Sequence, residues 1–352
     1  MGPGQSKKEK KISVFRGHTA SVARMTRDSK RLRAAQMLLL ANACWALSFP
    51  TMKALTLFAQ PLLPQSSSWF IASLTLTIRF ALAAVVMLMI CGRTLAQITR
   101  LEIWQGLGLG LFAGAGLIFQ MDGLAYTAAS TSAFLTQFYC LLIPLFVAWR
   151  ERRWPSPVVA VGCLMVIAGA AVLSEIHWRS MQVGRGELET LIGSTIFTGQ
   201  ILWLQRAKFA GNNVNHFTLV MFAVIALVCL PAAAATGGAP DHWSAACQSL
   251  PALGFMGILT FFCTLGGYLL MNYWQPFLSA TQAGLLYCFE PVFASLFALV
   301  LPQWFSAVSG IHYPNEQFGA SLLIGGGLIT GANALIQLRA TPVSHLQEKG
   351  SG

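Results

Sequence analysis

Residues Val158 to Val172 read VVAVGCLMVIAGAAV, and this run contains no charged side chain. The residues are apolar one after another, whereas a barrel strand would alternate apolar and polar residues over about 10 positions. Lipid offers no hydrogen-bond partner to an exposed backbone, so a chain that crosses it must form a helix or a closed barrel. The run therefore predicts a membrane-spanning helix, as does Ala81 to Ile90 (ALAAVVMLMI).

Apolar runs of this kind follow one another along the chain, with short polar breaks between them. A helix that crosses a hydrocarbon core of about 30 Å needs roughly 20 mostly apolar residues. Hydrophobic residues make up 55% of the 352-residue sequence and charged residues only 10%, and the mean hydropathy is +0.61. We therefore predict an all-α polytopic membrane protein with ten transmembrane helices and no separate soluble domain. The expected helices cover residues 34–53, 69–91, 103–122, 128–149, 157–174, 188–206, 216–236, 251–271, 278–301 and 318–338.

Positive charge gathers on one side of the expected helices. Lysine and arginine near the ends of membrane helices favour the cytoplasmic side, and an N-terminus placed there puts nineteen of the 23 basic residues on that side. This asymmetry predicts an even number of helices with both termini in the cytoplasm. Attraction to anionic lipid then explains the formal net charge of +11, so membrane lipid is an expected partner and nucleic acid is not.

A faint duplication divides the chain into two halves. A shift of 147 residues aligns Pro144 with Pro291 and Gly110 with Gly257. Five helices per half is an odd number, so the second half is expected to be inverted relative to the first. Inverted repeats are common in transporters, whose substrate site lies near the membrane midplane. The expected organisation is a disordered cytoplasmic leader at residues 1–33, five-helix repeats at 34–174 and 188–338, and a cytoplasmic tail at 339–352.

Several short segments carry a resemblance to a known family. They are Trp45-Ala46 and Lys53 in the first expected helix, Arg79-Phe80 in the second, Pro144 in the fourth, and Ser279-Ala280 with Glu290-Pro291-Val292-Phe293-Ala294 in the ninth. Across residues 34 to 338 the chain resembles the EamA-type branch of the drug/metabolite transporter superfamily. The resemblance implies a central cavity lined by the first, third, fourth, sixth, eighth and ninth helices. It also implies a carrier in the bacterial inner membrane for amino acids or other small metabolites, often an exporter.

Two charged residues lie well inside expected membrane helices, Arg79 in the second and Glu290 in the ninth. A charge at a helix centre costs about 2.5–3.5 kcal/mol on insertion scales, so such residues usually face a cavity or a partner. We expect Arg79 and Glu290 to approach each other or to face one water-filled space. The alternative is a structural role, as a fixed ion pair or a helix cap near a proline kink. A low-dielectric site favours the neutral form of a carboxyl group, so Glu290 is also a candidate for proton coupling.

Proline at positions 144 and 291 removes a backbone hydrogen bond and bends each helix. The carbonyl groups freed near Cys140 and Tyr287 are expected to meet substrate or water. Polar and aromatic side chains near these kinks and on neighbouring helices form the predicted cavity, although each could instead bond another helix or lie at the membrane interface. The predicted cavity residues are Asn42, Trp45, Gln120, Gln137, Tyr139, Gln200, Trp203, Tyr268, Gln282, Tyr287 and Glu290.

The eight cysteines and six histidines form no metal-binding pattern. CxxC and HExxH spacings are both absent from the sequence, so we expect no metal ion and no cofactor. The cysteines are interpreted as small apolar packing residues. Glycines four residues apart share a helix face and let two backbones approach closely. Such faces are predicted at Gly106, Gly110 and Gly114, and again at Gly327 and Gly331.

The leading functional hypothesis is a solute carrier that works by alternating access, with a small-molecule substrate and no enzymatic activity. A homodimer is left open. One alternative is an intramembrane enzyme, which would need a catalytic pair such as two aspartates or a zinc site within the bilayer. Another is a receptor or a channel, whose pore would need rings of like groups from several subunits.

Overall fold

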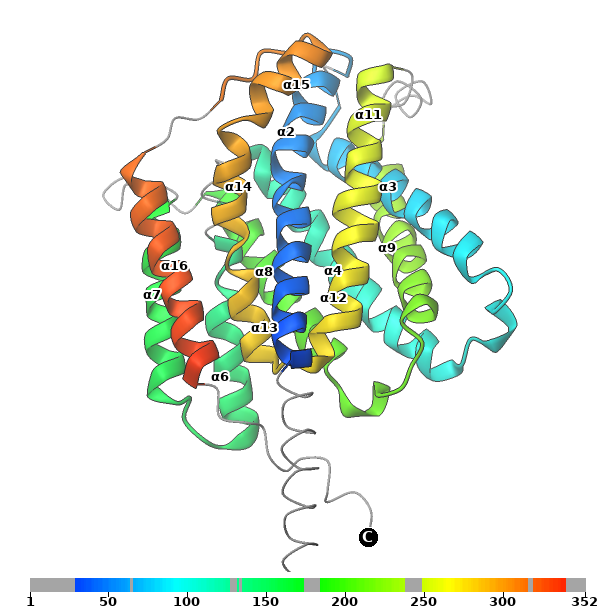
Figure 1. Cartoon of the computed structure of the whole chain (residues 1–352). Coiled ribbons are helices and arrows are strands. Elements are labelled where there is room, and N and C mark those ends of the chain that lie inside the picture. Colours follow the sequence, from blue (N-terminus) through cyan, green and yellow to red (C-terminus); the bar gives the residue numbers. More distant parts are fainter. Residues whose placement is uncertain are drawn as a thin grey trace, which may run out of the picture.

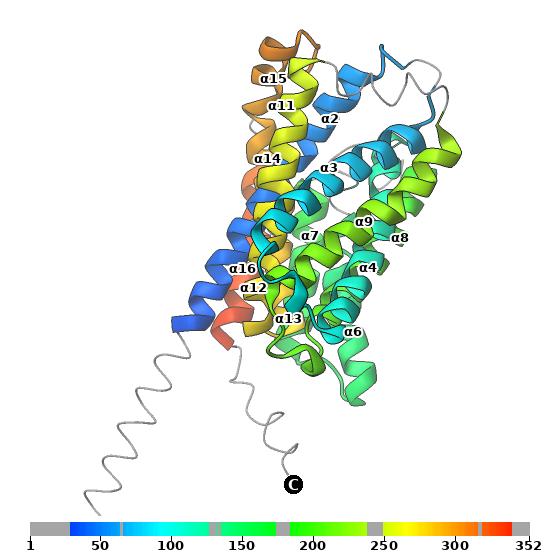
Figure 2. The same ribbon diagram turned by 90° about the vertical axis from the view of Figure 1, so that its right-hand side faces the viewer.

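The computed structural model describes residues 29–63, 66–126, 132, 135–173, 184–237, 249–315 and 319–339. Over these residues the chain is helical and contains no β-strand. The helices lie side by side in one bundle whose connections gather at two opposite faces (Figures 1 and 2). Most of the expected leader at 1–33 and nearly all of the expected tail at 339–352 lie outside the described residues.

The helices follow the apolar runs of the sequence. The first covers Ser29–Ala59, and its second part, after an interruption at Leu47, is α2 (Ser48–Ala59). A π-helix, Leu259–Gly266, joins α11 to α12. The remaining helices are α3 (Ser68–Cys91), α4 (Arg100–Tyr126), α6 (Tyr139–Glu151), α7 (Pro157–Leu173), α8 (Arg185–Leu204), α9 (Val214–Thr236), α11 (Leu250–Ile258), α12 (Gly267–Trp274), α13 (Ala280–Tyr287), α14 (Glu290–Ala298), α15 (Leu301–Ser309) and α16 (Ala320–Arg339).

Length and apolar composition make several of these helices fit to cross a membrane. Within the described residues, five qualify: Ser29–Ala59, Ser68–Cys91, Arg100–Tyr126, Val214–Thr236 and Leu250–Phe277. A sixth results if Ala280–Ala298 and Leu301–Ser309, which are bent by 54° relative to each other, count as one crossing. This all-helical architecture fits a multi-pass membrane protein. Ten crossings stay a prediction, because α6, α7, α8 and α16 do not reach the same length and apolarity over their described residues. The inverted repeat also stays a prediction.

Glycines on two faces of α4 let this helix lie very close to α8 and α9. A Cβ at Gly106 would lie 2.5 Å from the carbonyl oxygen of Phe217, and one at Gly110 would lie 2.6 Å from Val224 Cβ. On the other face, a Cβ at Gly108 would lie 2.3 Å from the ring of Trp203 on α8. The predicted glycine face of α4 is therefore a close helix contact. The prediction for the last helix is wrong at Gly327, where a Cβ would meet nothing within 4 Å.

Two helices at the centre of the bundle contain a proline that removes a backbone hydrogen bond. Pro144 lies inside α6, and Pro291 lies in the first turn of α14, just after the break between α13 and α14. A proline leaves the carbonyl four residues earlier without its helical donor. Protein groups bond both of these carbonyls, since Cys163 Sγ donates to Cys140 O at 3.2 Å and Asn42 Nδ2 donates to Tyr287 O at 2.9 Å. The freed carbonyls therefore hold the bundle together, contrary to the expectation that they meet substrate or water.

Candidate substrate cavity

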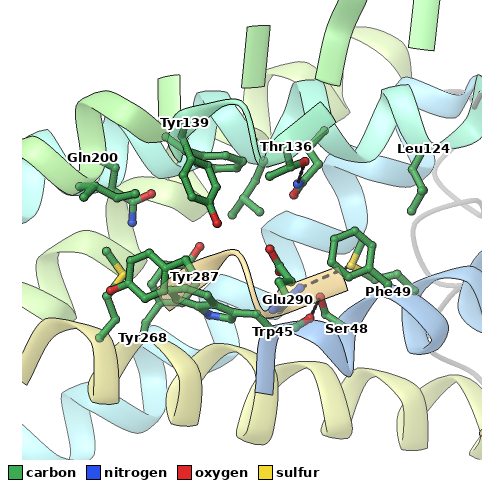
Figure 3. A pocket seen from close by; sticks show the side chains of 17 residues that line it. Trp45, Ser48, Phe49, Leu124, Thr136, Tyr139, Gln200, Tyr268, Tyr287 and Glu290 are labelled. Carbon is green, nitrogen blue, oxygen red and sulfur yellow. Dashed lines mark hydrogen bonds between the residues drawn. The ribbon is translucent and has the colours of Figure 1, made fainter. Parts of the chain in front are cut away.

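A cavity lies in the middle of the bundle, and side chains from both halves of the sequence point into it (Figure 3). The space open to the centres of water-sized molecules is about 80 Å³. By this measure one water needs roughly 10–15 Å³, so the cavity has room for several waters or a small solute. The cavity is lined by Trp45, Ser48, Phe49, Met52, Arg79, Leu117, Gln120, Leu124, Thr136, Tyr139, Phe197, Gln200, Ile201, Tyr268, Met271, Tyr287 and Glu290.

Aromatic rings form one wall of the cavity. The ring centroid of Trp45 lies 5.3 Å from that of Tyr268 and 5.3 Å from that of Tyr287, within the usual range for packed aromatic pairs. Trp45 can lie this close to α12 because residue 267 is glycine: a Cβ at Gly267 would lie 2.4 Å from Trp45 Nε1. The wall offers apolar surface and ring faces to a bound solute.

Arg79 brings a positive charge to the cavity from α3, and only 3% of it is exposed. Its Nε donates to Thr264 Oγ1, and its Nη1 lies 3.7 Å from the sulfur of Met52. Thr264 belongs to the π-helix Leu259–Gly266, a conformation that often marks functional sites. Within the described part of the chain, no carboxylate forms an ion pair with Arg79.

Glu290 places a carboxyl group in the same cavity. It is the first residue of α14 and is 9% exposed. Among the described residues, its carboxyl group has no hydrogen bond and no ion pair, and the ion pairs that do occur involve Arg185 and His216 instead. Tyr268 lies within electrostatic reach of both Glu290 and Arg79. Arg79 and Glu290 therefore line one cavity in this conformation and do not form a fixed ion pair, which was one of the two structural alternatives.

Amide and hydroxyl groups supply the neutral polar part of the lining. Gln120 Nε2 donates to Thr136 Oγ1 at 2.9 Å, which joins α4 to the residues that precede α6. Gln200 on α8 is buried, and its Nε2 has no hydrogen-bond partner among the described residues. Tyr139, the first residue of α6, completes this side of the cavity. These groups leave at least one donor, Gln200 Nε2, free for a solute.

Four predicted cavity residues lie elsewhere. Asn42 is bonded to the break between α13 and α14, and Gln137 is fully buried just before α6 without lining the cavity. Trp203 Nε1 donates to a backbone carbonyl at the start of α4. Gln282 forms a capping box with Ser279 at the start of α13. Asn42, Trp203 and Gln282 each bond a backbone group, as expected for residues that link helices or cap one and do not line a cavity.

Two threonines at the site, Thr136 and Thr264, were not among the residues predicted from the sequence. Thr264 and Thr136 both contact charged or amide groups at the cavity. A threonine in a helix commonly bonds its own backbone, as Thr136 Oγ1 does with Ser132 O at 2.8 Å, so its presence carries no signal of function. The role of Thr264 also depends on the π-helix, which has no sequence signature.

A second cavity, which we call the vestibule, adjoins the first. It shares Met52 and Leu124 with the first cavity and measures about 400 Å³ by the same criterion. The end of α2, the start of α3 and the end of α4 form its walls. It therefore lies at the face of the bundle opposite the end of α16 (Figure 1). Lys53 lines the vestibule, and its Nζ lies 5.5 Å from the ring centroid of Tyr313.

Comparisons with known proteins extend over most of the chain. No family model matches it. An uncharacterized transporter from Archaeoglobus fulgidus is 24% identical over 301 residues, which are 84% of this chain and 84% of that protein. A solved crystal structure of a protein described without a function covers 88% of this chain and 97% of that chain, with a TM-score of 0.58 and 18% identity. The second likeness establishes a shared fold, and the first relates the chain to a protein described as a transporter.

Proposed function

We propose that this protein is a membrane transporter that carries a small polar organic solute, with amino acids as the expected class, by alternating access. Three observations support the proposal. Several helices are long and apolar enough to cross a membrane, a protein described as a transporter is similar over 84% of the chain, and a small cavity with polar and ionisable groups in its lining lies at the centre of the bundle.

The observation that carries the substrate class is a guanidinium and a carboxyl group that line one cavity without pairing with each other. Arg79 and Glu290 are both buried there, and no ion pair joins them. A guanidinium can bind a carboxylate with two parallel hydrogen bonds. A carboxylate beside aromatic faces suits an ammonium group, which ring faces also attract. An amino acid carries both complementary charges and would neutralise both buried residues at once.

The proposed architecture is ten crossings in two inverted five-helix repeats, as in the EamA-type transporters that the sequence resembles. The charge asymmetry favours cytoplasmic termini, and the vestibule would then open to the opposite side. Rocking of one repeat against the other would close the vestibule and open the cavity toward the cytoplasm. Export across a bacterial inner membrane is the direction that the resemblance implies.

Transport into proteoliposomes tests this function. The purified protein is offered a panel of radiolabelled amino acids, amines and nucleosides. Glu290→Gln and Arg79→Gln each remove one charge-assisted contact of about 1.5–3 kcal/mol, so each should lower transport of an accepted amino acid by about 10- to 100-fold. Glu151→Gln and Arg93→Gln make the same changes at exposed positions and should transport normally.

Two results would count against the proposal. One is the absence of transport for every solute in the panel by protein that is folded and correctly inserted. The other is unchanged transport in both Glu290→Gln and Arg79→Gln, which would remove the two charges from substrate recognition. A substrate without a positive charge, transported equally by Glu290→Gln and the parent protein, would replace amino acids as the substrate class.

A further inference from the structure

One arginine bridges two helices at the vestibule end of the bundle. Arg185 is the first residue of α8, and its Nη2 contacts Asp122 Oδ2 at 2.5 Å while its Nε contacts Glu189 Oε1 at 2.8 Å. Its Nη1 donates to the hydroxyl of Tyr126 at 3.0 Å, and its Cζ lies 4.3 Å from the centroid of that ring. Asp122 and Tyr126 belong to α4, so the cluster joins α4 to α8.

The two carboxyl groups are buried, although the arginine above them is not. Asp122 is fully buried and Glu189 nearly so, whereas 47% of the Arg185 side chain is exposed. Asp122 Oδ1 and Glu189 Oε2 are both buried without a hydrogen-bond partner among the described residues. A buried polar atom without a partner is costly. Within the described part of the chain, the site therefore lacks a donor for these two oxygens.

The charge of the cluster points to the missing donor. One guanidinium contacts two carboxyl groups, which brings these two groups within electrostatic reach of each other. With both ionised, the cluster would bury a net negative charge. Two neighbouring carboxyl groups avoid this by retaining one proton between them. The O–H of one then donates to the free oxygen of the other and satisfies both.

No other charged group among the described residues faces the pair. On α8, Glu187 caps its own helix by accepting from the backbone N–H of Gly184 at 2.9 Å. On α3, the hydroxyl of Ser68 lies 2.9 Å from that of Tyr126, and Ser68 also lines the vestibule. The titratable groups of the other adjoining helices lie in the substrate cavity, in the core or at the far end of the bundle: His216 and Cys229 of α9, Tyr139, Cys140, Arg150 and Glu151 of α6, and Tyr287 of α13.

We propose that Asp122 and Glu189 form a proton-binding site, in which the two carboxyl groups share one proton beneath Arg185 while α4 and α8 remain in contact. Separation of α4 from α8 at this end admits water to both groups, and the proton passes to water and leaves two carboxylates. The site is distinct from the cavity of Arg79 and Glu290. Through Tyr126 and Ser68 it reaches the wall of the vestibule, so it links a proton to the state of that entrance. This linkage rests on the proposed function, whereas the proton site itself does not.

Infrared spectroscopy of the purified, detergent-solubilised protein detects the shared proton directly. At pH 7 the parent protein should show the carbonyl stretch of a protonated carboxyl group. Asp122→Asn and Glu189→Gln should each abolish this band, because removal of either carboxyl leaves one carboxylate paired with one guanidinium. If one of the two variants fails to fold, a band that persists in the other still overturns the proposal. Glu187→Gln, on the same helix, should keep the band, and Glu290→Gln identifies any band that belongs to the substrate cavity.

The outcomes separate the shared proton from simpler alternatives. Loss of one band in both Asp122→Asn and Glu189→Gln supports the proposal. A parent spectrum without a band that responds to either substitution overturns it. Loss in only one variant also overturns it, since the proton would then belong to a single carboxyl group. The readout needs no transported solute, so its failure is distinct from a failure of the proposed function.

Discussion

The amide of Asn42 donates to the carbonyl oxygen of Tyr287 at 2.9 Å and so ties the first helix to the break between α13 and α14. The same Nδ2 also lies 3.0 Å from the carbonyl oxygen of Leu286. Pro291 deprives the Tyr287 carbonyl of its helical donor, and lipid offers no replacement. One side chain of the first helix therefore supplies the hydrogen-bond donor that is missing at a helix break 245 residues further along the chain.

Asn42→Ala should destabilise the protein, because it leaves two buried carbonyl groups without this donor. The expected loss is about 1–3 kcal/mol, the cost of leaving a buried polar group unpaired. Thermal unfolding in detergent, followed by intrinsic fluorescence, measures it. Gln60→Ala removes an amide at the exposed end of α2 and should leave the melting temperature unchanged. Equal melting temperatures for Asn42→Ala and Gln60→Ala would show that the helix break does not depend on Asn42.

Alanine should lower stability at only one of two glycines, Gly110 and Gly257, that the shift of 147 residues aligns. A Cβ at Gly110 would lie 2.6 Å from Val224 Cβ and 2.8 Å from the carbonyl oxygen of Met221, whereas one at Gly257 would meet nothing within 4 Å. Gly110→Ala should therefore cost about 1–3 kcal/mol through overpacking of α4 on α9. Gly257→Ala should be neutral or stabilising by up to about 1 kcal/mol, because alanine favours the helix. Paired unfolding curves measure the difference, and a destabilised Gly257→Ala with an unaffected Gly110→Ala would contradict this packing.

The positions of the long helices followed directly from the apolar runs. The runs at 69–91 and 216–236 form the helices Ser68–Cys91 and Val214–Thr236. Within one segment, only a helix satisfies the backbone hydrogen bonds of a chain surrounded by lipid. The interruptions within helices could not be predicted from the sequence, because they depend on partners from other helices. They are the breaks at Leu47 and between α13 and α14, and the π-helix before Gly267. Prolines located one break approximately, but not the groups that would bond the freed carbonyls.

The residues of the candidate site that could be predicted from the sequence are those whose burial costs a large free energy. Arg79 and Glu290 were identified because a charge within a membrane needs a polar environment, and both line the cavity. Amide and indole N–H donors are less informative, since a backbone carbonyl anywhere in the bundle satisfies them, as it does for Asn42 and Trp203. The cluster beneath Arg185 was missed because its acidic residues lie near helix ends, where sequence suggests solvent.

Gly267→Ala should impair transport more than stability. A Cβ at residue 267 would lie 2.4 Å from Trp45 Nε1, and the indole can relieve this contact by moving into the cavity. Transport in proteoliposomes should fall about tenfold or more, the effect of roughly 1.4 kcal/mol, with little change in melting temperature. Gly254→Ala, which meets nothing within 4 Å, is the matched control. Combining Gly267→Ala with Trp45→Phe should cause no loss beyond that of Trp45→Phe alone; an additive loss would argue against displacement of the indole.

The end of α4 opposite the vestibule is held by contacts of a second buried carboxyl group. Glu102 accepts from the backbone N–H groups of Thr99 and Asn213, each at 2.8 Å, and its Oε2 lies 3.0 Å from His216 Nδ1. The carboxylate thus joins the turn before α4 to the first turn of α9, and both partners are buried. Removal of one partner leaves the other without its contact, so the two residues should not contribute independently.

A double-mutant cycle should therefore reveal coupling between Glu102 and His216. Glu102→Gln and His216→Gln should each destabilise the protein, and the double variant should lose less than the sum of the two, with an interaction energy of about 0.5–3 kcal/mol. Glu102→Gln should be the more harmful single change, because the carboxylate also accepts from two backbone donors and a glutamine offers only one acceptor oxygen. Additive losses would mean that His216 is held by Thr94, 3.0 Å from its Nε2, and not by the carboxylate.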